Sequence, residues 1–155
     1  NGTYQTQNSH INITGGYLIS TADYADYLPP SGTTTISGGK CYGAAGGVCS
    51  QRGTLNVEGT ALITSKGTGS TGNWGDGTGG LDCAAINVSG AYGIATVNIK
   101  GGTLIAEAKS LITEGTTYTP VINVTGGTFS DPSALKFIKT HANVHIKRTA
   151  DKNCP

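Results

Sequence analysis

The chain has 155 residues, of which 25 are glycine and 12% are charged, and its formal net charge is +1. That length predicts one domain, and so small a net charge offers no electrostatic basis for binding nucleic acid. No stretch of the sequence approaches the ~20 apolar residues of a membrane span, so we expect no membrane insertion.

A short phrase recurs along the chain: an aliphatic residue, usually Asn, a second aliphatic residue, a polar residue, and then one or two glycines. An element this short cannot bury its own apolar edge, so successive copies must stack on one another. The repeat therefore predicts an all-β fold, a single-stranded parallel β-solenoid (β-helix) of about five coils. The copies are INITGG (11–16), TTISGG (34–39), LNVEG (55–59), INVSG (86–90), VNIKGG (97–102) and INVTGG (122–127).

The spacing of the copies gives the length of one coil. Consecutive copies lie 23, 21, 31, 11 and 25 residues apart, and the two irregular steps together equal two steps of 21. One coil therefore takes roughly 21–25 residues, which lies within the range of solenoid repeats. The short step indicates that the copies at 86–90 and 97–102 occupy two sides of one coil.

Each copy alternates with period two, so its aliphatic residues face inward and its Asn faces the other way. Glycine suits the corner that follows because it adopts positive φ without a Cβ clash. The Asn side chains have two interpretations: a hydrogen-bonded ladder along the stack, or separate solvated positions. The five asparagines are Asn12, Asn56, Asn87, Asn98 and Asn123.

Three insertions interrupt the predicted coils, at residues 22–32, 66–82 and 114–120. Loops on a rigid scaffold commonly carry function, so these segments are the candidate binding surface. The second insertion contains Trp74, the only tryptophan, whose ring can stack on a sugar or can fold back over a coil. We expect Tyr24, Tyr27 and Tyr118 to extend such a ligand-binding surface.

Four cysteines, Cys41, Cys49, Cys83 and Cys154, favour an oxidising compartment and disulfide bonds. Three pairings are possible, of which we favour Cys41–Cys49 together with Cys83–Cys154. The close Cys pairs typical of zinc sites do not occur, and His141 and His145, which are four residues apart, have no evident third ligand. We therefore expect no metal and no cofactor. The chain also lacks methionine altogether, which favours an extracellular or cell-surface protein whose signal peptide has been removed.

The last segment, residues 131–155, changes character and is predicted to cap the coils of residues 1–130 within one structural domain. Asp131 and Pro132 are typical of a helix start. The helix should continue over 133–141 with Leu135 and Ile138 as a buried stripe. Residues 143–148 should form a final strand that covers the exposed end of the stack.

Three runs of the sequence, GTLNVEGTALIT, ATVNIKGGTLIAEA and INVTGGTFSDPSALKFI, carry a resemblance to a known class. They resemble the Gly/Thr-rich repeats of cell-surface proteins from gut-type Gram-positive bacteria, which are similar to pectin-lyase-like parallel β-helices. The resemblance covers most of residues 10–140, and GGTFSDPS is its most specific part. It implies a β-helix at the cell surface and offers no shared catalytic residues; the cysteines and the basic tail depart from the usual pattern.

These observations favour a non-catalytic surface module, adhesive or structural, that presents its loops to a glycan or to a host or cell-surface protein. One rival is a self-assembling filament subunit, in which a copy of the chain adds a strand at the first coil. A second rival is a small carbohydrate-active enzyme, but glycoside cleavage needs two opposed carboxylates and the nine in this chain are scattered. We therefore expect no enzymatic activity.

Overall fold

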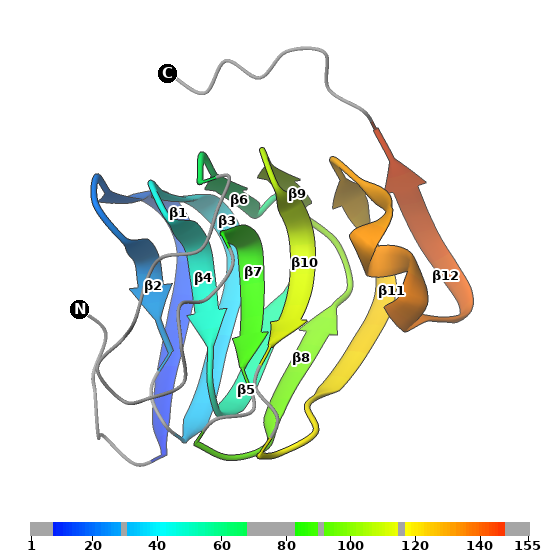
Figure 1. Ribbon diagram of the computed structural model, residues 1–155, viewed down its shortest axis with the longest axis horizontal. Helices are drawn as coiled ribbons and strands as arrows, with labels where there is room; N and C mark the ends of the chain where they lie inside the picture. The colour runs from blue at the N-terminus through cyan, green and yellow to red at the C-terminus, as the bar shows by residue number, and fades with distance from the viewer. Residues whose placement is uncertain (1–7, 29–30, 68–82, 90–91, 115–116, 148–155) are drawn as a thin grey trace.

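A computed structural model describes the protein, and its described residues are 8–28, 31–67, 83–89, 92–114 and 117–147. Over these residues the chain is all-β apart from one short 3-10 helix, η1. The elements, shown in Figure 1, are β1 (Ser9–Ser20), β2 (Tyr24–Tyr27), β3 (Gly32–Gly43), β4 (Gly46–Ser50), β5 (Gly53–Val57), β6 (Leu62–Ser65), β7 (Ala84–Ser89), β8 (Ala95–Ile99), β9 (Thr103–Ala106), β10 (Lys109–Glu114), β11 (Val121–Phe129), η1 (Pro132–Phe137) and β12 (Ile138–Ile146).

All described strand pairs are parallel, and they form two sheets. The larger sheet has eight strands and runs β1-β3-β5-β8-β11-β9-β6, with β12 paired to β11. The smaller sheet has four strands in the order β10-β7-β4-β2. Figure 1 shows β1 and β2 at one end of the molecule and β12 at the other.

This pairing corrects the predicted architecture. Six strands, β3-β5-β8-β11-β9-β6, close into a parallel barrel because β3 and β6 also pair, and the four-stranded sheet accompanies them. Closure arises because β3 and β11 both continue through a glycine corner without ending. Before the corner β3 pairs with β5, and after it β3 pairs with β6; β11 pairs in the same way with β8 and β9. The solenoid of about five separate coils is therefore wrong, whereas the all-β class is confirmed.

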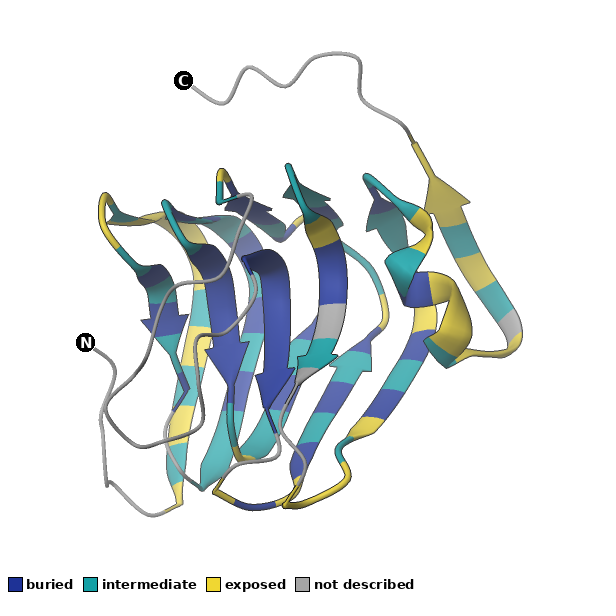
Figure 2. Cartoon of the chain, viewed as in Figure 1, coloured by how far each residue is buried: buried dark blue, intermediate teal, exposed yellow. Residues whose placement is uncertain are grey.

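The recurring phrase sets the register of the larger sheet. The second aliphatic residues of five copies pair in turn: Ile13 with Ile36, Ile36 with Val57, Val57 with Ile99, and Ile99 with Val124. The sixth copy lies in β7 of the smaller sheet, so the copies separated by the short step do occupy different sheets. Alternation places these aliphatic side chains in one continuous core with Leu104, Leu111 and Phe129. Strands β4 and β7 are buried along their whole length (Figure 2).

The C-terminal segment begins as predicted and then departs from the prediction. Asp131 is the N-cap of η1 and accepts a hydrogen bond from the Ser133 backbone N–H at 2.7 Å, with Pro132 in the first turn. The helix ends at Phe137 instead of 141, because the chain turns extended at Ile138 and begins to pair with β11. The predicted buried stripe is wrong: Leu135 and Ile138 are 48% and 36% exposed, and Ala134 is the buried residue of η1.

Candidate functional site

The glycines that follow the repeated phrase form a line of corners across neighbouring strands. Gly59, Gly102 and Gly127 have φ values of 59°, 83° and 115°, in the region that favours glycine. The corners stack through backbone hydrogen bonds: Gly102 N–H donates to the Gly59 carbonyl at 3.1 Å, and Thr128 N–H donates to the Gly102 carbonyl at 2.9 Å. Because these residues have no side chain, the surface outside the corners is hollowed.

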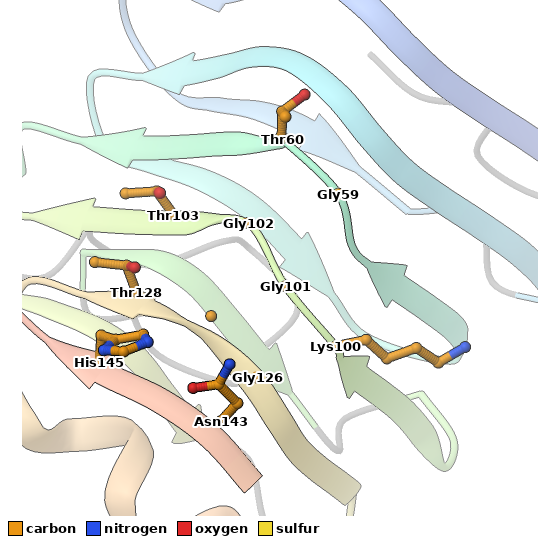
Figure 3. Close-up of a pocket in the computed structure, with 11 residues that line it drawn as sticks. Gly59, Thr60, Lys100, Gly101, Gly102, Thr103, Gly126, Thr128, Asn143 and His145 are labelled. Atoms are coloured by element: carbon orange, nitrogen blue, oxygen red, sulfur yellow. The ribbon is translucent and has the colours of Figure 1, made fainter.

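A groove with a volume of about 460 Å³ lies along this line of corners (Figure 3). Threonines from three successive levels, Thr60, Thr103 and Thr128, line one side of it, and Thr103 and Thr128 are directly paired. Strand β12 adds Asn143 and His145, which are exposed and pair with Gly126 and Thr128. The complete lining is Gly59, Thr60, Lys100, Gly101, Gly102, Thr103, Gly126, Gly127, Thr128, Asn143 and His145.

The lining consists of glycines and of residues with polar side chains, two of which, Lys100 and His145, are basic. Lys100 stands at one margin, where its Nζ lies 3.8 Å from the Glu58 carboxylate and both side chains are largely exposed. A pair this exposed contributes little to stability because water screens it. His145 stands on β12 (Figure 3). The groove therefore offers hydroxyl, amide, imidazole and ammonium groups together with exposed backbone, which is an arrangement suited to hydrogen-bonding a polar ligand.

Three of the five repeat asparagines, Asn56, Asn98 and Asn123, form the ladder that one of the two interpretations predicted. The outward orientation predicted for Asn87 is wrong, because this residue lies in β7 and is buried. Asn123 Nδ2 donates to Asn98 Oδ1 at 2.9 Å, Asn98 Nδ2 donates to Asn56 Oδ1 at 3.0 Å, and Asn56 Nδ2 donates to Thr35 Oγ1 at 3.3 Å. Each amide in the middle of the row both donates and accepts. The ladder ties β3, β5, β8 and β11 together on the strand segments that lead into the corners, and so it holds the groove's framework in register.

A second polar feature lies in the interior and consists of Asp26 on β2 and Cys41 on β3. Asp26 is buried, and its Oδ2 has no hydrogen-bond partner among the described residues. Burial raises the pKa of this carboxyl group above its usual value. Burial, and secondarily the charge of Asp26, raise the pKa of the Cys41 thiol to about 11. These groups lie in the core and do not reach the groove lining.

The structure does not bring the predicted aromatic surface together. Tyr24 is buried and packs edge-on against Tyr27, with ring centroids 5.6 Å apart. Tyr118 is exposed, but it follows β10, at the opposite edge of the four-stranded sheet from β2. Trp74 lies outside the described residues. The buried ring of Tyr24 therefore serves the core, and Tyr118 does not adjoin it.

The predicted Cys41–Cys49 disulfide is wrong. Both residues are buried, but Cys41 lies in the main core and Cys49 lies in a separate cluster with Tyr24. Successive side chains of a strand face opposite sides, and Cys49 follows the core residue Val48, so its sulfur is directed away from Cys41. Cys83 is also buried and forms no disulfide among the described residues, and Cys154 lies outside them.

Sequence reasoning missed the groove residues themselves. The sequence predicts a strand over 143–148, whose alternation places Asn143 and His145 on one face. The strand in the structure, β12, begins earlier and spans Ile138–Ile146. What the sequence did not indicate was that this strand would pair beside the corner of β11, because the pairing skips residues of β12. The double glycines were the available signal, since a row of them leaves a surface without side chains.

No family model, curated protein or solved structure gives a significant match to this chain. The resemblance to Gly/Thr-rich surface repeats therefore stays a prediction. In the described part of the chain, no three His, Cys, Asp or Glu side chains are grouped so that they could hold a metal ion. None of the described helices has the length and apolar character to span a membrane.

Proposed function

We propose that the protein is a non-catalytic, adhesive module of the cell surface or extracellular space that binds a glycan along the groove of glycine corners. The observation that carries this proposal is the repetition of small and hydroxyl-bearing residues in the groove. Thr103 and Thr128 stand on adjacent, directly paired strands, with His145 of β12 beside Thr128. Adjacent strands lie about 4.8 Å apart, so these polar groups recur at a regular short interval.

A polyhydroxylated ligand fits this lining better than an apolar one does. Threonine hydroxyls both donate and accept hydrogen bonds, and the Asn143 amide does the same through separate atoms. The glycines let a sugar ring approach the backbone closely, because no Cβ stands in the way. The volume of about 460 Å³ lies within the range of small-ligand sites, and two or three sugar units can lie along a groove of this kind.

The lining favours binding over cleavage. Glycoside hydrolysis needs a pair of carboxyl groups on opposite sides of the scissile bond. The described lining residues include no Asp or Glu, and the nearest one in sequence, Glu58, is paired with Lys100 at the margin. A glycan held here would meet hydrogen-bonding groups without an acid and base arranged around it.

The experiment is binding of the purified chain to a panel of immobilised glycans and mucins, compared with an Asn143→Ala/Thr128→Ala double variant. We expect the double variant to lose at least about tenfold in affinity, because two hydrogen-bonding side chains of the groove are removed. Trp74→Ala is the matched comparison, since it removes the aromatic ring that the sequence nominated and changes none of the described lining residues.

The two variants separate the alternatives. Binding that falls with Asn143→Ala/Thr128→Ala and persists with Trp74→Ala supports the groove. Binding lost only with Trp74→Ala places the ligand on the insertion at 66–82 and overturns the groove as the site. Retention of a cell-surface protein in place of any glycan would overturn the ligand class.

A further inference from the structure

The end of the molecule formed by β1 carries an uncovered strand edge. Strand β1 pairs with β3 along both of its halves, and no described strand pairs with its other edge. Tyr17, Leu18 and Ile19 are all exposed here, and Ile13 is only partly buried against the core. Figure 2 shows this strand as mostly exposed or intermediate beside the buried interior strands.

One row of paired, inward-facing residues runs across six neighbouring strands, and the residue of this row on β1 has no neighbour on its outer side. The four central members are completely buried, while the two end members, Leu18 and Ile146, are 38% and 39% exposed. Leu18 thus occupies a core position whose outer neighbour is missing. From one end to the other the row consists of Leu18, Cys41, Ile63, Leu104, Phe129 and Ile146.

A glycine at this edge points to a second backbone beside it. At the equivalent corner position of β3, a Cβ on Gly38 would collide with the carbonyl oxygen of Thr14 on β1. In β11, a Cβ on Gly126 would likewise collide with the Lys100 carbonyl. Gly15 is the same residue of the repeat in β1, yet it has no atom within 4 Å of its Cβ position and its φ is not positive. Nothing within the described chain requires glycine at position 15.

The opposite end of the molecule is protected against strand addition. Between Val124 and Gly126, two steps of β11 are matched by five steps of β12, which makes a wide bulge in the edge strand. Exposed lysines stand within and just after this strand, at Lys139 and Lys147. Bulges and lysines are the usual means of blocking edge pairing. Strand β1, by contrast, contains no Lys, Arg, Asp or Glu.

We propose that β1 is a self-association edge, at which a second copy of the chain adds its own β1 in antiparallel orientation around a two-fold axis. An uncharged strand can face its own copy without like-charge repulsion, whereas the lysine-bearing β12 edge is a poor partner. A two-fold axis through the corner at Gly15 and Gly16 sets Ile13 of one copy opposite Leu18 of the other. Both exposed core positions are then covered, and the isologous contact closes as a dimer without growing into a filament.

The test is the molar mass of the full chain in solution, measured by sedimentation or light scattering over a range of concentrations. We expect a dimer for the wild type. Leu18→Lys places a charge at the centre of the contact and should raise the dimer's Kd by at least about tenfold. Ile146→Lys is the matched control, because it makes the same change in the same row at equal exposure on the other end, and it should leave the dimer intact.

A second variant guards against misfolding. Gly15→Ala meets no atom within the monomer, so its folding should match the wild type while its added Cβ weakens the contact between the two backbones. A wild-type chain that is monomeric at all concentrations overturns the proposal. So does a dimer that resists both Leu18→Lys and Gly15→Ala, and so does association that Ile146→Lys reduces as strongly, since that result means head-to-tail contact. This proposal stands independently of the ligand in the groove.

Discussion

The carboxyl group of Asp26 is the one acidic side chain that the structure buries among its described residues, with 8% of the residue exposed. A buried carboxylate loses the hydration that stabilises its charge, so the folded protein favours the protonated form. This burial could not be predicted from the sequence. Asp26 stands in an insertion rich in Tyr and Pro that resembled a surface loop, and it became interior because β2 pairs with β4.

The raised pKa of Asp26 makes stability depend on pH in a defined direction. The pKa of this carboxyl group is higher in the folded protein than in the unfolded chain. Its contribution to the free energy of unfolding is therefore complete below the unfolded-state pKa and is lost as the pH rises through the folded-state pKa. We expect Asp26→Asn to remove this loss and to be more stable than the wild type at neutral pH. Urea unfolding of both proteins between about pH 4 and about pH 8 measures how the difference in their free energies of unfolding changes with pH. Parallel pH profiles for the two proteins would contradict the assignment.

At the scale of the element, the repeated phrase determines both the register of the strands and the ladder of asparagines. Hydrophobic alternation predicted which aliphatic residues face inward, and the pairing of Ile36, Val57 and Ile99 confirms it. The end of η1 could not be predicted in this way. Leu135 and Ile138 have helical spacing, but pairing of the following residues with β11 competes with the helix and prevails.

The ladder predicts a graded cost of removing its asparagines. Asn98 donates to Asn56 and accepts from Asn123, so Asn98→Ala should lower the free energy of unfolding by about 1–3 kcal/mol, as two hydrogen bonds are lost. Asn12→Ala, at the exposed end of the same column, should cost less than about 0.5 kcal/mol. Chemical denaturation of both variants measures the difference. Equal effects at the two positions would show that the asparagines act as separate solvated residues.

For the molecule as a whole, local pattern predicted the strands but not how they close. The sequence places a glycine corner after each copy but does not indicate whether strand pairing stops at that corner or continues through it. In β3 and β11 the backbone continues hydrogen bonding through the corner, which joins two faces into the closed ring. The groove depends on that continuity and on the offset pairing of β12, both of which are long-range properties that composition and spacing do not encode.

Burial determines how the cysteines should react. Cys41, Cys49 and Cys83 are all buried, so we expect none of them to react with iodoacetamide while the protein is folded. The pKa of about 11 further suppresses the reactive thiolate of Cys41. After unfolding without reductant, Cys41 should be alkylated, as peptide mass spectrometry can establish. Modification that requires prior reduction would instead reveal a disulfide, and rapid labelling of the folded chain would contradict the burial.

The parallel pairing of the strands has a consequence for how the chain reaches its folded state. Neighbouring strands are never joined by a tight hairpin in the described pairs: Val124 and Ile138 are 14 residues apart, whereas Leu55 and Val97 are 42 apart. Each pairing must therefore close a loop before its hydrogen bonds form, and this entropic cost slows folding. The span between β5 and β8 is the longest such closure in the larger sheet, together with that between β6 and β9. A newly made chain will thus expose the edges of β5 and β6 until the second half of the sequence supplies β8 and β9 to cover them.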